Sequence, residues 1–182
     1  MNRKSFIAAA AAVLALTFGL AAAPEAEANG KGKTKSPNLV EVAIAVNSSG
    51  PYAGQFDTLI AAVLAADPAV VQRLTAKRQS TVFAPTDAAF EAVGLTPANI
   101  ETALDEATLT QILLYHVVNG RRDANDVLAS SQLRTLQGTF LQQSAGRLTD
   151  NLDRQATIIV TDVPASNGII HAIDAVVLPF AP

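Results

Sequence analysis

Hydrophobic residues recur with helical spacing through the first half of the chain. Phe56, Leu59, Ile60, Val63 and Leu64 fall at i, i+3, i+4, i+7 and i+8, which predicts a helix with one face on a core. Shorter stripes and start signals predict further helices: a stripe at Leu39–Ile44, a start at Asp67-Pro68, a short helix introduced by Thr96-Pro97, and a helix over LTQILLYHVV introduced by a capping box of Thr108 with Gln111.

Residues 81–90, TVFAPTDAAF, predict a strand that turns sharply into a helix. Thr81–Phe83 is β-branched and aromatic, as strands prefer, and Pro85 ends the pairing because it has no N–H. Thr86-Asp87 offers oxygens to cap a helix that starts at Ala88. The bend contains no Ser, Cys or His, so this stretch indicates architecture and not an active site.

The last third of the chain changes to short β-type runs. They lie at residues 133–136, 139–142, 157–163 and 169–178, between glycines and asparagines that suit turns. Helices mostly precede strands, an order that disfavours a regular βαβ parallel sheet. It predicts an α+β domain in which helices pack on a largely antiparallel β framework.

The N-terminal segment has the pattern of an export signal. Arg3 and Lys4 precede an uncharged run, Phe6–Ala23, and Ala26-Glu27-Ala28 supplies the small residues of a cleavage site. We expect a signal peptide over 1–28, a flexible Lys- and Gly-rich linker over 29–37 and a single domain over 38–180. The protein would then be secreted or extracytoplasmic, without stable membrane insertion after cleavage. Cleavage after Ala23 and an uncleaved membrane anchor are the alternatives.

Charge and cysteine content exclude several classes of function. The formal net charge is -3, and the basic clusters that stand out are Lys31/Lys33/Lys35 and the pair Arg121-Arg122. Nucleic acid is not an expected partner, because phosphate binding requires a concentrated basic surface. The chain has no cysteine, which excludes disulfides, thiolate zinc sites and thiol catalysis.

The two histidines are the main candidates for chemistry, and both have a structural explanation. His116 shares the apolar helical stripe of Leu109, Ile112 and Leu113, and His171 lies among aliphatic residues of the last strand. We expect both to be core histidines with hydrogen-bonded ring nitrogens. No catalytic or metal-binding motif is present in the sequence. The protein is therefore expected to be no enzyme and to hold no cofactor or metal.

Three blocks of the sequence carry a resemblance to a known family. TVFAPTDAAF at 81–90, LLYHVVNGR at 113–121 and ASNGIIHAIDAVVLP at 165–179 resemble the signature blocks of the fasciclin domain, in order, over nearly all of the expected mature chain. The resemblance implies a β-sandwich or wedge with several helices packed along one side. It also implies non-catalytic adhesion to a cell-surface or matrix protein or polysaccharide.

The resemblance also implies two binding pairs. The family's Tyr-His pair corresponds to Tyr115-His116, and its Asp-Ile pair corresponds to Asp162-Val163. The apolar stripe, in contrast, predicts that His116 packs inward. Tyr115 is rotated by about 100° from it on a helix, so its hydroxyl is predicted to reach the surface while its ring stays packed.

Three functions remain open from the sequence. The leading one is a secreted or cell-surface adhesion module. The alternative is an extracytoplasmic carrier of a small apolar ligand, a lipid or a pigment, because a helix-flanked wedge can open an apolar groove. A hydrolase is the third and has the least support.

Overall fold

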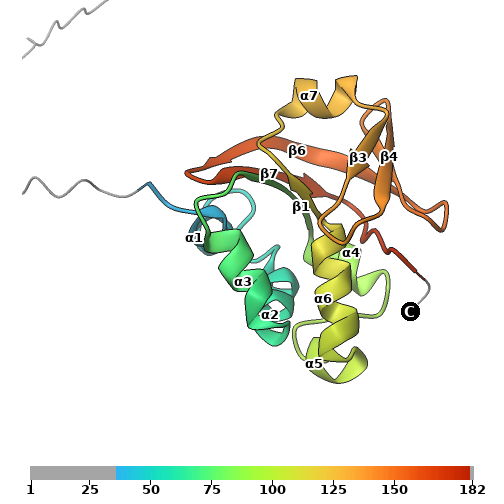
Figure 1. Cartoon of the computed structure of the whole chain (residues 1–182). Helices are drawn as coiled ribbons and strands as arrows, with labels where there is room; N and C mark the ends of the chain where they lie inside the picture. Colours follow the sequence, from blue (N-terminus) through green and yellow to red (C-terminus); the bar gives the residue numbers. More distant parts are fainter. Residues whose placement is uncertain (1–35, 181–182) are drawn as a thin grey trace, which may run out of the picture. The chain divides into compact units, whose positions relative to one another are not determined.

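The computed structural model describes residues 36–180. The expected signal peptide and nearly all of the expected linker lie outside the described residues. The described part of the chain forms seven helices and seven strands, most of which are labelled in Figure 1. The helices are α1 (Leu39–Ser48), α2 (Asp57–Ala65), α3 (Pro68–Thr75), α4 (Asp87–Glu91), α5 (Ile100–Ala103), α6 (Glu106–Tyr115) and α7 (Ala124–Ala129). The strands are β1 (Ser80–Pro85), β2 (Val117–Asn119), β3 (Gln132–Arg134), β4 (Phe140–Ser144), β5 (Arg147–Thr149), β6 (Gln155–Ala165) and β7 (Gly168–Ile173).

All seven strands belong to one sheet in the order β2-β1-β7-β6-β5-β4-β3. Five of the six strand pairings are antiparallel, and the exception is the parallel pair of β1 with β7. The prediction of a largely antiparallel framework is therefore confirmed. Gly168 is required in this parallel pair, because a Cβ there would lie 2.0 Å from the carbonyl oxygen of Ser80 on β1.

The sheet folds back on itself along β6. This strand pairs with β5 through residues 155–157 and with β7 through residues 158–165, with register shifts on either side of Val160. Such bulges bend a strand and increase its twist. The two edges of the sheet then meet, since Val118 of β2 forms a bridge with Thr135, just after β3.

The folded sheet encloses a core to which every strand contributes one fully or almost fully buried residue. Tyr115, Val127 and Val177 fill the rest of this interior. From β1 to β7 along the chain, the contributing residues are Phe83, Val118, Leu133, Leu141, Leu148, Ala156 and Ile173.

A second core lies between the sheet and the helices. Figure 1 shows α1 to α6 on one side of the sheet and α7 on the other. Ala84, Ile170 and Ala172 of the sheet pack there against buried residues of the helices, among them Leu59 and Leu113. The α+β class with several helices along one side is thus confirmed, and the two halves of the folded sheet face each other as in a wedge.

The corner at residues 81–90 forms as expected, but the Asp87 carboxylate does not cap the helix that follows it. Thr86 caps α4 by accepting a hydrogen bond from the amide of Ala89 at 3.4 Å. Asp87 instead caps α2, accepting from the amides of Asp57 and Thr58 at 3.1 and 2.8 Å. The corner therefore fixes the start of a helix 30 residues earlier in the chain.

Some local predictions are wrong for identifiable reasons. Helix α6 starts at Glu106 with Asp105 as its cap, so Thr108 donates to that carboxylate and is not itself the cap. The helix ends at Tyr115, and Val117 begins a strand. The last strand ends at Ile173, five residues before its predicted end at Leu178. Strand β5 and helix α7 are absent from the predictions because each is short and buries a single side chain fully.

Within residues 36–180, no single helix is long and apolar enough to span a bilayer. Helices α2 and α3 reach that length and composition only as a pair, which is bent by 115°.

We predict that Asp87→Ala lowers the free energy of unfolding by about 1–2 kcal/mol, the usual effect of losing a helix cap, because two amides of α2 lose their acceptor. Asp87→Asn should lose less, since it keeps one acceptor oxygen. Glu91→Ala on the exposed side of α4 is the control, and urea unfolding is the measurement. Equal stability of Asp87→Ala and Glu91→Ala would contradict the capping role.

Candidate functional site

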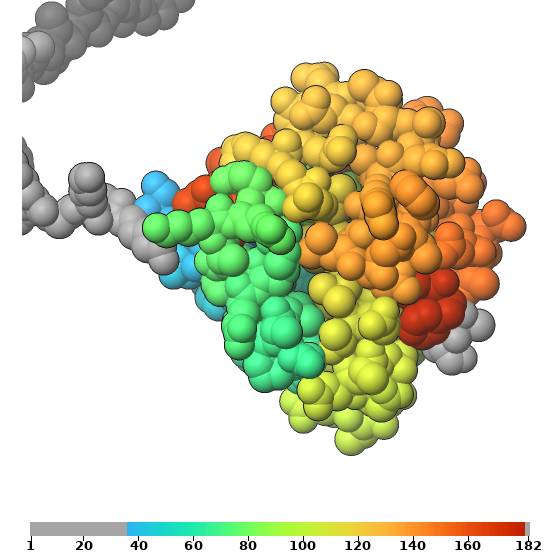
Figure 2. All heavy atoms as spheres, in the orientation of Figure 1, coloured from blue at the N-terminus to red at the C-terminus, as the bar shows by residue number. Residues whose placement is uncertain are grey.

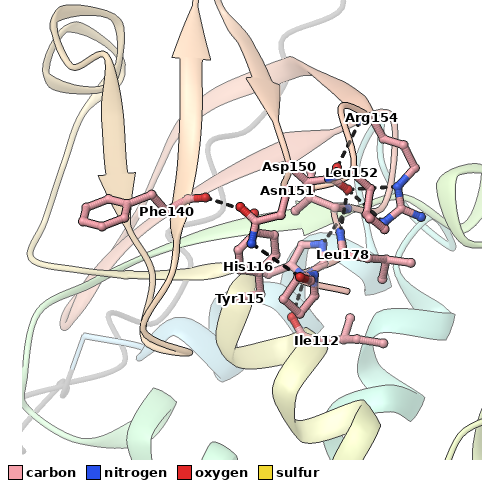
Figure 3. Close-up of polar contacts among 11 residues, drawn as sticks. Ile112, Tyr115, His116, Phe140, Asp150, Asn151, Leu152, Arg154 and Leu178 are labelled. Carbon is pink, nitrogen blue, oxygen red and sulfur yellow. Dashed lines mark hydrogen bonds and ion pairs between the residues drawn. The ribbon is translucent and has the colours of Figure 1, made fainter. Parts of the chain in front are cut away.

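Tyr115, the first of the implied binding residues, is fully buried. It is the last residue of α6 and has no exposed surface. Its hydroxyl donates a hydrogen bond to the carbonyl of Phe140 on β4 at 3.1 Å (Figure 3). Burial, together with the nearby Asp150 carboxylate, raises the pKa of Tyr115 to about 12. The prediction that its hydroxyl reaches the surface is wrong, because the folded sheet covers the end of α6.

His116 is a core histidine, as predicted. Its ring Nδ1 donates to the carbonyl of Ile112 at 2.8 Å, and its Nε2 accepts from the amide of Val177 at 3.3 Å. Burial lowers the pKa of His116 to about 4, although the bond to Ile112 and the charge of Asp150 act in the opposite direction. The ring therefore stays neutral at pH 7 and holds the C-terminal segment against α6.

Asp150 secures the same C-terminal segment from the other side. Its buried carboxylate accepts from the amides of Leu152, Arg154 and Leu178 at 2.8, 3.0 and 2.9 Å, and it pairs with the Arg154 guanidinium at 2.9 Å. Figure 3 shows this cluster beside Tyr115 and His116. The tyrosine, the histidine and the aspartate thus form a structural junction, in which few polar atoms are left free to meet a partner.

Asp162 and Val163 lie on β6, and only Asp162 is exposed. Asp162 has a φ of +62°, and its carboxylate accepts from the amide of Ala124 at 2.9 Å. Its own amide donates to Nδ1 of His171 at 3.2 Å. Val163 is half-buried and packs against the core between sheet and helices. Among the described residues, no hydrogen bond or ion pair joins this pair to Tyr115-His116.

His171 is fully buried and stacks on Phe83, with ring centroids 5.7 Å apart. Its Nε2 donates to the carbonyl of Arg122 at 3.0 Å, while Nδ1 accepts from Asp162. Both ring nitrogens are occupied, so His171 is also a core histidine. Within residues 36–180, no group of three or more His, Cys, Asp or Glu side chains is arranged to hold a metal ion.

An apolar groove lies between α1, α2 and the sheet. It contains a cavity of about 110 Å³ and an adjoining cavity of about 30 Å³. Both are lined by Ala43, Leu59, Ala84 and Ile170. The groove is lined almost wholly by aliphatic and aromatic side chains, and such a surface favours apolar groups.

Two of the implied binding residues contact this groove. His116 lines the larger cavity and Val163 the smaller one, whereas Tyr115 and Asp162 line neither. The bonds of His116 to Ile112 and Val177 use both of its nitrogens, so it offers the larger cavity mainly its ring surface.

Exposed aliphatic side chains stand at the rim of the groove. Ile44 of α1 and Leu64 of α2 line the larger cavity and are 46% and 75% exposed. The prediction that the stripe of α2 places Leu64 on the core is therefore wrong. The groove could have been suspected from the sequence, because α1 and α2 carry more apolar residues than one buried helix face can hold.

Comparison with known proteins gives consistent matches. The fasciclin domain family model matches residues 54–179. The Synechocystis protein sll1483 is 43% identical over 129 residues, 68% of this chain and 67% of that protein. The uncharacterized Synechocystis protein sll1735 is 38% identical over 144 residues, 78% and 98% of the two chains. The pig transforming growth factor-beta-induced protein ig-h3 is 30% identical over 69% of this chain, which spans 18% of that protein.

A solved structure shows the same fold. The FAS1 domain pair from the insect cell adhesion molecule fasciclin I superposes with a TM-score of 0.60 at 20% sequence identity. The match covers 79% of this chain and about half, 51%, of the other.

We predict that His116 makes stability fall in mild acid. The unfolded chain binds a proton near the ordinary value of 6.5 and the folded chain only near 4, so stability is full above 6.5 and decreases as pH falls between these values. His116 should account for about 2 kcal/mol between pH 7 and pH 5.

Urea unfolding of the parent and of His116→Leu across this range measures the effect. The variant should be less stable at pH 7, because Val177 and Ile112 lose a partner, but its pH dependence should be flatter. Parallel pH profiles for the two proteins would contradict the assignment.

Proposed function

The chain belongs to the fasciclin domain family, and from this premise we propose that it is a non-catalytic adhesion module that acts outside the cytoplasm. Its partner would be a cell-surface or matrix component. The observation that carries the proposal is the pair of exposed aliphatic side chains, Ile44 and Leu64, at the rim of the apolar groove. Aliphatic side chains beside a concave apolar surface are typical of protein contact sites.

The buried junction argues for the groove over the Tyr115-His116 pair as the contact surface. Exposing the pair would break the bond of Tyr115 to Phe140 and that of His116 to Val177, and it would open a core shared by all seven strands. Contact at the rim requires no such rearrangement. Asp162 is the implied residue that remains accessible, and it lies on β6, beyond the cavity linings.

The test is attachment of the purified protein to native cell envelopes. Leu64→Asp should weaken attachment at least about tenfold, because burying a leucine in a contact stabilises it by about 1.5–3 kcal/mol. Val93→Asp is a matched control, since Val93 is 41% exposed but lines neither groove cavity. Equal attachment of both variants with unchanged melting curves would refute the rim as the contact.

Binding of a small apolar ligand is the second candidate, and the continuity of the two cavities favours it. They share four lining residues and have a narrow, almost wholly apolar interior, which suits an unbranched hydrocarbon chain with its polar end at the rim. Ala43 lies where the cavities adjoin.

Protein purified from its native source should then release an apolar molecule into organic solvent, detectable by mass spectrometry and, for a pigment, by absorbance. Ala43→Leu should lower the occupancy several-fold by narrowing the junction, while attachment through the rim persists. An empty native protein would refute the carrier function and leave the adhesion proposal unaffected.

A further inference from the structure

Basic side chains gather at one end of the sheet. Residues 36–180 contain eight arginines and lysines, at positions 73, 77, 78, 121, 122, 134, 147 and 154. The first five belong to α3, to the turn that follows it and to the segment after β2. We call these five residues the basic end. Along the chain these residues form two separate pairs, Lys77-Arg78 and Arg121-Arg122. The fold brings the two pairs to one end of the sheet and adds Arg73.

Backbone contacts hold the segments of the basic end together. The amide of Gly120 donates to the carbonyl of Gln79 at 3.0 Å, and Ser80 pairs with Asn119. The amide of Arg122 donates to the hydroxyl of Thr81 at 2.8 Å. Figure 2 shows the green surface of the segment that follows α3 beside the yellow surface that follows β2.

Two of the arginines are held in place. The Arg121 guanidinium donates through Nη1 to the carbonyls of Ala165 and Gly168 at 3.0 and 2.6 Å. Arg73 donates through Nη2 to the side chain of Asn119 at 3.1 Å. These contacts restrict the side chains before any ligand arrives, which lowers the entropic cost of binding.

The positive charges of the basic end are not neutralised within the described chain. The one ion pair formed by residues 36–180 joins Arg154 and Asp150, elsewhere in the molecule. Arg73 has a buried Nη1 that finds no hydrogen-bond partner among these residues. Burial and the neighbouring Arg78 lower the pKa of Arg73, as expected for uncompensated cations side by side.

Two acidic side chains close to the segment after β2 already hold hydrogen bonds to α7. Asp123 follows Arg122 directly, but its carboxylate caps α7 by accepting from the amide of Asp126 at 2.9 Å. Asp162 accepts from the amide of Ala124 on the same helix. Neither forms an ion pair with the basic end. The positive charge there therefore remains available to an external anion.

We propose that the basic end binds an acidic polysaccharide, whose carboxylate or sulfate groups pair with Arg73, Lys77, Arg78, Arg121 and Arg122. Planar guanidinium groups suit bidentate contacts with such anions. This surface would add a second, charged contact to the proposed adhesion, and its biological use rests on that function.

The surroundings favour a polysaccharide over other polyanions. Single-stranded nucleic acid is held by exposed aromatic side chains, and the aromatic residues of the described chain lie outside the segments 73–79 and 119–122. Membrane surfaces are bound by exposed aliphatic groups next to the cations. The large exposed hydrophobic residues of the described chain, such as Leu64 and Ile159, also lie outside these segments.

The test measures binding of the full chain to polygalacturonate and dextran sulfate, with neutral dextran as a reference, at about 50 mM salt, where screening is weak. The double variant Lys77→Gln with Arg78→Gln changes two exposed side chains, so folding should be unaffected. It should bind about tenfold more weakly to whichever acidic polymer the parent prefers. Arg134→Gln with Arg147→Gln removes the same charge elsewhere and should bind as the parent does.

Several outcomes would overturn the proposal. An equal loss in the two double variants would show a net-charge effect only. Loss of binding in a Lys31→Gln, Lys33→Gln and Lys35→Gln variant, with binding retained in Lys77→Gln/Arg78→Gln, would assign binding to the N-terminal lysines. Tighter binding of DNA or of phosphatidylglycerol vesicles at the same salt would assign the surface to another polyanion.

Envelope attachment separates this proposal from the adhesion function. A parent protein that attaches to envelopes but binds neither acidic polymer would refute the polysaccharide site alone. A parent that binds the polymers but does not attach would support the site and refute adhesion.

Discussion

Closure of the folded sheet is the constraint on which the rest of the structure depends. Strands β2, β3 and β5 are three residues long, so each can direct only one or two side chains inward. The enclosed core takes one buried residue from every strand, and loss of any of them would leave a cavity that its short neighbours could not fill. The bulges around Val160 and the bridge of Val118 with Thr135 follow from this need to bring the two sheet edges together.

The closure also explains why the second sequence block is so distinctive without being a contact surface. Helix α6 ends where the sheet edges meet, and Tyr115 reaches into the enclosed core and bonds to β4. His116 then links the helix to the C-terminal segment, which Asp150 holds from its other side. Each residue joins elements far apart in the sequence. Surfaces for partners must therefore lie outside this junction, on the helices and at the ends of the strands.

Periodicity and turn residues are enough to predict the class of the fold and most of its helices, because those signals are local. Thr86 lies next to the helix that it caps and can be recognised from sequence. Asp87 cannot be assigned in the same way, since its acceptor role depends on amides 30 residues earlier. The groove cannot be predicted for a similar reason. The stripe on α2 shows that Leu64 is apolar, but only the packed structure shows that its side chain is largely exposed. The basic end is likewise invisible along the chain, because β1 and β2 must pair before its two segments meet.

The two proposed surfaces meet at α3, which has a side chain on each. Leu74 lines the larger cavity, while the preceding Arg73 turns to Asn119 at the basic end. Consecutive helical residues point about 100° apart, so one short helix can serve an apolar and a charged surface without mixing them. Asn167 fixes the end of this helix by donating to the carbonyls of Leu74 and Ala76, both at 2.7 Å. The turn at Asn167-Gly168, in the sequence block at 165–179, therefore positions both the groove and the basic end. Its role goes beyond reversing the chain direction.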